Sequence, residues 1–147
     1  GEAAFTLSGG TLYDPTNYSF TTSLATAAAN GKYYFSPGQE KTFTLTITPS
    51  FVYSGTTEPL YYNYQDQELY RDSAMTQATV SGVKVGWTAA LYCGSTKVHE
   101  FTPVHVSGEI KLTIPTTIKY EDTYILKVTY TYMGLSYNSN YTIYGSL

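Results

Sequence analysis

The chain has 147 residues, of which 16% are aromatic and only 13% are charged, and its net charge at pH 7 is −3. With 8 Lys and Arg residues it lacks the basic excess of nucleic-acid-binding domains, and its apolar content excludes an intrinsically disordered chain. The length predicts a single domain over residues 1–147, and no apolar run approaches the ~20 residues of a membrane-spanning helix.

The first 36 residues predict an irregular edge region. Short strands are expected at 4–7 and 11–13, on either side of Gly9-Gly10. Residues 22–30 predict a short helix, with Thr21 or Thr22 as N-cap, an alanine-rich body and a stop at Asn30-Gly31. A further short strand is expected at 33–35.

From residue 42 onward the dominant hydrophobic period is two, which is typical of half-buried antiparallel strands. Residues 42–48 alternate apolar residues with threonine, and Pro49 is expected to end that strand. Further strands are expected at 83–91, ending at the turn Cys93-Gly94-Ser95, and at 97–102, 110–114 and 124–132. Since almost no helix is expected, the sequence predicts an all-β, antiparallel β-sandwich with a tyrosine-rich insertion at 50–79.

The last two strands are expected to form a hairpin around the two-residue turn Met133-Gly134. This turn fixes a register in which Tyr132 pairs with Leu135 and Tyr130 pairs with Tyr137. One face of the hairpin is then expected in the core, through Tyr124, Leu126, Val128 and Tyr141. The other face is expected in water, through Thr129, Thr131 and Asn138.

Three segments together resemble the immunoglobulin-like or fibronectin type III sandwich, over about residues 37–144. Residues 37–45 look like an opening turn and second strand, and Trp87 is similar to the core tryptophan of the third strand. Residues 122–128 look like the start of the sixth strand, with Tyr124 six residues after Ile118 as in a tyrosine corner. The inter-sheet cysteine pair is missing. The resemblance implies an immunoglobulin-like sandwich, with Trp87 buried between two sheets near Leu45 and Leu126.

The composition and the resemblance also indicate a location. The single cysteine, Cys93, excludes an intrachain disulfide, whereas small extracellular eukaryotic domains more often carry cysteine pairs. We therefore expect a bacterial protein, either secreted or on the cell surface, whose signal peptide has been removed. The resemblance implies an accessory module of a surface, adhesion or glycan-handling protein.

The most distinctive candidate site is the segment 61–72, which is rich in tyrosine, acids and amides. Tyrosine rings can stack on sugars while carboxylates and amides bond to hydroxyls, so this segment is a candidate glycan-binding surface. The alternative is an inserted hairpin whose rings cover the flank of the sandwich, because aromatic cross-strand pairs are ordinary sheet stabilisers. The candidate ligand-binding residues are Tyr61, Tyr62, Tyr64, Asp66 and Tyr70.

Other reactive residues form no recognisable motif. Asp66, Glu68 and Asp72 lack the spacing of an EF-hand, which favours a solvated acidic loop over a calcium site. His99 and His105 would lie roughly 20 Å apart on an extended chain, too far for one metal ion. We therefore expect no cofactor and no metal.

The function expected from these features is a non-catalytic binding or spacer module used in adhesion or assembly. Its partner would be a glycan or a surface protein and not a nucleic acid. One alternative is a carbohydrate-binding module that uses residues 61–70. A weaker alternative is a small hydrolase whose acids converge only in space.

Overall fold

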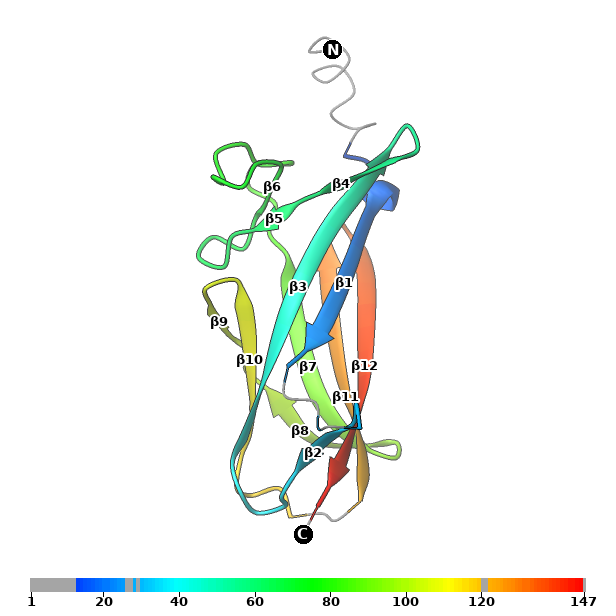
Figure 1. The fold of residues 1–147 in the computed structure, drawn as a ribbon, viewed down its shortest axis with the longest axis vertical. Helices are drawn as coiled ribbons and strands as arrows, with labels where there is room; N and C mark the ends of the chain where they lie inside the picture. The colour runs from blue at the N-terminus through cyan, green and yellow to red at the C-terminus, as the bar shows by residue number, and fades with distance from the viewer. Residues whose placement is uncertain (1–12, 26–27, 29, 120–121, 147) are drawn as a thin grey trace.

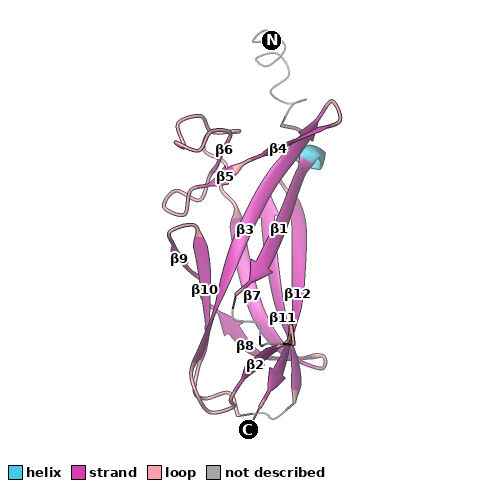
Figure 2. Cartoon of the chain, in the orientation of Figure 1, coloured by secondary structure: helices cyan, strands magenta, loops and turns pink. Residues whose placement is uncertain are grey.

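The computed structural model describes residues 13–25, 28, 30–119 and 122–146, and their regular structure is β apart from one 3₁₀ turn (Figures 1 and 2). The strands form two larger sheets and one two-stranded ribbon. The elements in chain order are η1 Pro15–Asn17, β1 Tyr18–Leu24, β2 Tyr33–Phe35, β3 Lys41–Tyr53, β4 Thr56–Pro59, β5 Tyr61–Tyr62, β6 Leu69–Tyr70, β7 Gly86–Cys93, β8 Thr96–Phe101, β9 Val104–Val106, β10 Glu109–Ile114, β11 Thr123–Tyr132 and β12 Leu135–Gly145.

The two larger sheets pack face to face, so the predicted all-β sandwich is confirmed. The first sheet has the order β1-β3-β10-β9, with β4 also paired to β3, and the second has the order β2-β12-β11-β7-β8. Aromatic rings of the two sheets are in contact across the interface. The ring centroid of Phe20 in β1 lies 5.4 Å from that of Tyr130 in β11, and the ring centroids of Tyr18 and Tyr132 are 4.9 Å apart. The sandwich is elongated, with β5 and β6 at one end and β2 at the other (Figure 1).

The second sheet is mixed, which corrects the expectation of purely antiparallel sheets. After β1 the chain leaves the first sheet and joins the outer edge of the second, where β2 runs parallel to β12. Tyr33 is opposite Ile143 and Phe35 is opposite Gly145. A three-residue strand carries too little pattern to indicate its partner or direction in advance.

Alternation places the core where the sequence predicts it. In β3, Phe43, Leu45 and Ile47 are buried, and they face the apolar side of β11 across the sandwich. In β10, Ile110, Leu112 and Ile114 are buried in the same way. The predicted strands 42–48, 110–114 and 124–132 are therefore confirmed.

The predicted register of the C-terminal hairpin is also confirmed. Tyr132 pairs with Leu135, and every later partner follows to Thr123 with Tyr144. Both turn residues have positive φ, 52° at Met133 and 82° at Gly134, as a type I′ turn requires. The apolar face of β11 is buried as expected. Tyr141 is only half-buried, because it lies at the open edge where its hydroxyl meets Thr22 Oγ1 at 2.5 Å.

Pro49 does not end its strand, contrary to the expectation. β3 continues to Tyr53 and turns at Ser54-Gly55 into β4. Pro49 O accepts a hydrogen bond from Leu60 N at 3.0 Å. Because the N and C=O of a strand residue point to the same side, the missing N–H of Pro49 faces Leu60 and leaves the ladder with β1 intact.

The helix predicted at 22–30 is wrong where the structure describes it. Thr22 and Leu24 belong to β1, in which Tyr18, Phe20 and Leu24 are buried at even positions and extend the alternating pattern. The strands predicted at 4–7 and at 11–12 fall outside the described residues, as do residues 26, 27 and 29 of the predicted helix.

Candidate functional site

Residues 60–85, here called the tyrosine lobe, form a separate layer at one end of the sandwich, beside the β9–β10 hairpin (Figure 1). At its centre, β5 and β6 pair Tyr61 with Tyr70 and Tyr62 with Leu69. Directly paired residues share a face, so Tyr61 and Tyr70 lie on one side of this ribbon. Tyr62 and Leu69, on the other side, are buried.

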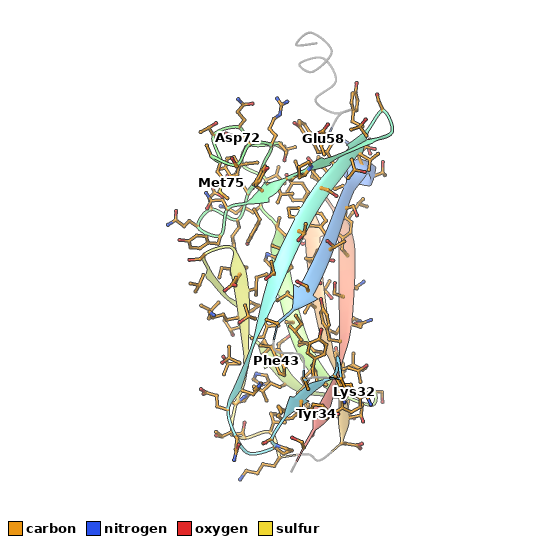
Figure 3. All side chains as sticks on the ribbon, in the orientation of Figure 1. Lys32, Tyr34, Phe43, Glu58, Asp72 and Met75 are labelled. Carbon is orange, nitrogen blue, oxygen red and sulfur yellow. The ribbon has the colours of Figure 1, made fainter. Side chains whose placement is uncertain are left out.

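The tyrosine lobe is ordered mainly by side chains that bond its own backbone. Asn63 Oδ1 accepts from Gln65 N at 2.8 Å, and Asp66 Oδ1 accepts from Glu68 N at 2.9 Å. At the tip, where Figure 3 labels Asp72 and Met75, Asp72 Oδ1 accepts from Thr76 N and Gln77 N at 3.0 and 2.9 Å. The bond from the Thr76 hydroxyl, together with these backbone donors, lowers the pKa of Asp72.

The tyrosine lobe shares the core of the sandwich through buried residues such as Leu69, and Thr79 Oγ1 lies 3.0 Å from the Tyr132 hydroxyl. A further contact is made by four residues, here called the junction cluster: Tyr62, Gln67, Trp87 and His105. Trp87 Nε1 donates to the Tyr62 hydroxyl at 3.2 Å, and His105 Nδ1 lies 3.1 Å from the same oxygen. Gln67 Nε2 lies 3.4 Å from His105 Nε2. Because an amide nitrogen can only donate, His105 Nε2 accepts and Nδ1 carries the proton toward Tyr62.

The environment of the junction cluster keeps it uncharged at neutral pH. Burial raises the pKa of Tyr62 to about 12 and lowers the pKa of His105. Both shifts disfavour the charged form, as desolvation does. The cluster therefore offers ring faces and neutral hydrogen-bonding groups, an arrangement suited to holding surfaces together or to recognising an uncharged ligand.

The structure divides the five predicted ligand residues between two environments. Tyr62 is buried in the junction cluster, whereas Tyr61, Tyr64, Asp66 and Tyr70 are half-buried. The Tyr70 hydroxyl donates to Asp66 Oδ2, and this bond raises the pKa of Tyr70 to about 12. Tyr61, Tyr70 and Asp66 therefore remain together as one accessible group, while Tyr62 lies apart from them.

The acids of the tyrosine lobe do not converge on one point. Glu68 Oε1 accepts from Gly82 N at 3.0 Å, and Asp66 and Asp72 are bonded within their own turns. Among the described residues, no group of His, Cys, Asp and Glu side chains is arranged to hold a metal ion. In that same part of the chain, no helix has the length and apolar character needed to cross a membrane.

The sequence predicts Trp87 in the core and assigns His105 no role in a site. Trp87 is half-buried at the end of β7, with ring centroids 6.0 Å from Tyr62, 5.0 Å from Tyr130 and 6.3 Å from His105. The expected burial near Leu45 and Leu126 gives way to this aromatic junction. The sequence carries no direct signal for His105, because alternation alone would place Val104 and Val106 inward, whereas both are exposed.

Comparisons of the chain with protein-family models, with curated proteins and with solved structures found no match.

Proposed function

We propose that this protein is a non-catalytic binding or spacer module, of immunoglobulin-like architecture, that serves adhesion or assembly outside a bacterial cell. The observation that carries the proposal is a compact lobe, rich in tyrosine, mounted at one end of a sandwich. Variable immunoglobulin domains likewise carry their binding loops at one end of the sandwich. The tyrosine-rich and threonine-rich composition and the single cysteine support a bacterial surface or secreted location.

Strand order supports the immunoglobulin-like assignment. Naming the strands A to G along the chain makes β1, β3, β10 and β9 the A, B, E and D strands. β7, β11 and β12 then take the places of C, F and G in the second sheet. This order is the same as in the two sheets of the constant-type immunoglobulin fold, with β2 and β8 as additional edges, and it supports the proposal.

The accessible rings of the tyrosine lobe favour a carbohydrate as the bound partner. Tyr61 and Tyr70 share one face of the β5–β6 ribbon, and the Asp66 carboxylate lies beside Tyr70. Sugar rings can stack on two such aromatic faces, while a carboxylate accepts bonds from sugar hydroxyls. The tyrosine lobe is thus proposed as a carbohydrate-binding surface on a non-catalytic scaffold.

A glycan array followed by titration of the strongest hit tests this proposal. Tyr61→Ala and Tyr70→Ala are expected to remove binding and to leave the melting temperature nearly unchanged, because both side chains are half-buried. Tyr62→Ala is the matched control, and it is expected to lower the melting temperature. A protein that binds no glycan, or binds equally well without both rings, would leave only the spacer role.

A further inference from the structure

A second recessed surface lies far from the tyrosine lobe, on the solvent face of the second sheet. Residues of β8, β7 and β11 surround a depression of about 180 Å³. Its centre is Ala90, which is opposite Lys127 on one side and Glu100 on the other. The small side chain of Ala90 leaves a hollow between the longer side chains that flank it.

A β-bulge shapes one wall of this depression. The pairing of β7 with β8 shifts between Leu91 and Tyr92, so that Leu91 is opposite His99 but Tyr92 is opposite Lys97. In a regular ladder without this shift, Tyr92 would be opposite Val98, and Lys97 would be opposite Cys93 on the core side of the sheet. The bulge instead brings Lys97 onto the solvent face, where its Nζ lies 3.4 Å from Glu100 Oε1. Re-aiming a side chain in this way is a common role of bulges next to functional sites.

The depression carries a local positive charge on a chain whose net charge is −3. Its lining holds two lysines, Lys97 and Lys127, and one acid, Glu100. Lys97 and Glu100 pair with each other, whereas Lys127 makes no ion pair with any residue that the structure describes. A cation is therefore left for a ligand, at the edge of a depression that Tyr92, Thr88 and Thr129 also line.

We propose that this depression binds one anionic unit of an acidic polysaccharide. Lys127 pairs with the carboxylate or sulfate, the Tyr92 ring packs on the sugar ring, and Glu100 accepts bonds from sugar hydroxyls. The volume of about 180 Å³ suits one sugar unit, since sites for drug-sized ligands reach roughly 300–1,000 Å³.

The same features disfavour an acidic peptide as the ligand. An extended peptide gains most of its affinity by pairing with a free strand edge. The depression is centred on β7 and β11, which are interior strands, and the edge strand β8 only borders it. The hydroxyls of a sugar also offer donors to the Glu100 carboxylate, and the ionised side chains of an acidic peptide offer none. The site is separate from Tyr61 and Tyr70, and the proposal is independent of binding by the tyrosine lobe.

Calorimetric titration of the full chain with short oligogalacturonate and with a sulfated oligosaccharide tests the proposal. We expect saturable binding of at least one of them, weakened by salt, and none of methyl-esterified oligogalacturonate or of poly-glutamate. Lys127→Gln is expected to lower the affinity roughly tenfold or more, the effect of losing one charge-assisted bond. Which of the two acidic saccharides binds more tightly identifies the anionic group.

Three further variants complete the test. Ala90→Thr fills the hollow with a residue suited to a strand, so it is expected to abolish binding while the melting temperature is kept. Lys111→Gln, which removes a lysine from the other sheet, and the double variant Tyr61→Ala/Tyr70→Ala are expected to bind like the parent. Absence of binding to both acidic saccharides, equal binding of the methyl ester or the peptide, or unchanged affinity in Lys127→Gln would overturn the proposal.

Discussion

The C-terminal hairpin and the tyrosine lobe are both built from chain-neighbouring segments, yet they are held together differently. β11 and β12 share a ladder of ten residue pairs, whereas β5 and β6 share two. In the lobe, side-chain hydrogen bonds replace the missing ladder bonds. The acceptors include Asn63, Asp66 and Asp72, and the backbone N–H donors are two to five residues away. A ladder follows from strand periodicity, but these turns depend on individual side chains.

This difference bears on how the two regions tolerate change. The hairpin buries its apolar face against the opposite sheet, so a change there affects the whole sandwich. The hydrogen bonds of the tyrosine lobe are mostly local, and the lobe meets the sandwich through the junction cluster, the pair of Thr79 and Tyr132 hydroxyls, and its buried apolar residues. Its outer residues can therefore vary while the scaffold is retained, as is common for binding surfaces carried on loops.

The largest expected change in the free energy of unfolding comes from replacing a buried leucine by alanine, once in the hairpin and once in the lobe. Leu126→Ala, at a core position that is 1% exposed, is expected to lower the free energy of unfolding by about 2–5 kcal/mol. Leu69→Ala, at a lobe position that is 0% exposed, is expected to cost less, since the smaller lobe can collapse around the gap. Denaturant unfolding measures both. An equal loss in both variants would show that the structure around Leu69 relaxes no more readily than the structure around Leu126.

A second test probes close packing between β7 and β11. Gly86 is opposite Thr131, and a Cβ at residue 86 would lie 2.6 Å from Thr131 Oγ1. Gly86→Ala is expected to lower the free energy of unfolding by about 1–3 kcal/mol through this overlap. Thr131→Ala in the same chain is expected to restore most of the loss, measured as a double-mutant cycle. Additive effects would contradict the assignment to this contact.

A smaller effect of opposite sign is expected at the hairpin turn. Met133 holds a φ of 52°, which asparagine adopts more readily than methionine. Met133→Asn creates the favoured Asn-Gly turn and is expected to raise the free energy of unfolding by roughly 0.5–1 kcal/mol. Thermal melting measures the gain. A lower melting temperature would mean that the methionine side chain, which packs against the core, outweighs the turn preference.

The last prediction concerns pH and is confined to the junction cluster. The pKa of His105 is lowered from 6.5 by burial, so the folded protein binds that proton less readily than the unfolded chain. The contribution of His105 to stability is therefore complete above about pH 6.5 and is lost as the pH falls through the folded pKa. Protonation of His105 would also place a hydrogen on its Nε2, so that this atom could no longer accept a hydrogen bond from Gln67 Nε2.

Trp87 reports this change directly, because it is the single tryptophan of the chain. Its fluorescence is expected to change as the pH falls below 6.5 in the parent and to stay level in His105→Gln. His99, whose pKa burial also lowers, is the control, and His99→Gln is expected to keep the transition. A transition that persists without His105 would assign it to another group.

The sequence was sufficient for the sandwich and insufficient for the tyrosine lobe, for physical reasons. Alternation and Met133-Gly134 determine the hairpin register, since a one-residue slip would expose its apolar face. The ring partners of Trp87 come from segments that alternation does not connect, such as Tyr62, 25 residues away. The strand end predicted at Pro49 was wrong because the missing N–H of Pro49 lies on the side away from β1. The ladder between β3 and β1 therefore needs no donor at this residue.

The parallel pairing of β2 with β12 gives the sandwich a mechanical property. When tension pulls β2 toward its N-terminal side and β12 toward its C-terminal side, two parallel strands slide past each other instead of peeling apart. The ladder from Tyr33–Ile143 to Phe35–Gly145 then bears the load together, reinforced by the bond from Ser146 N to Phe35 O at 2.7 Å. Tension applied to β2 and β12 in these directions would therefore load this edge of the domain in shear.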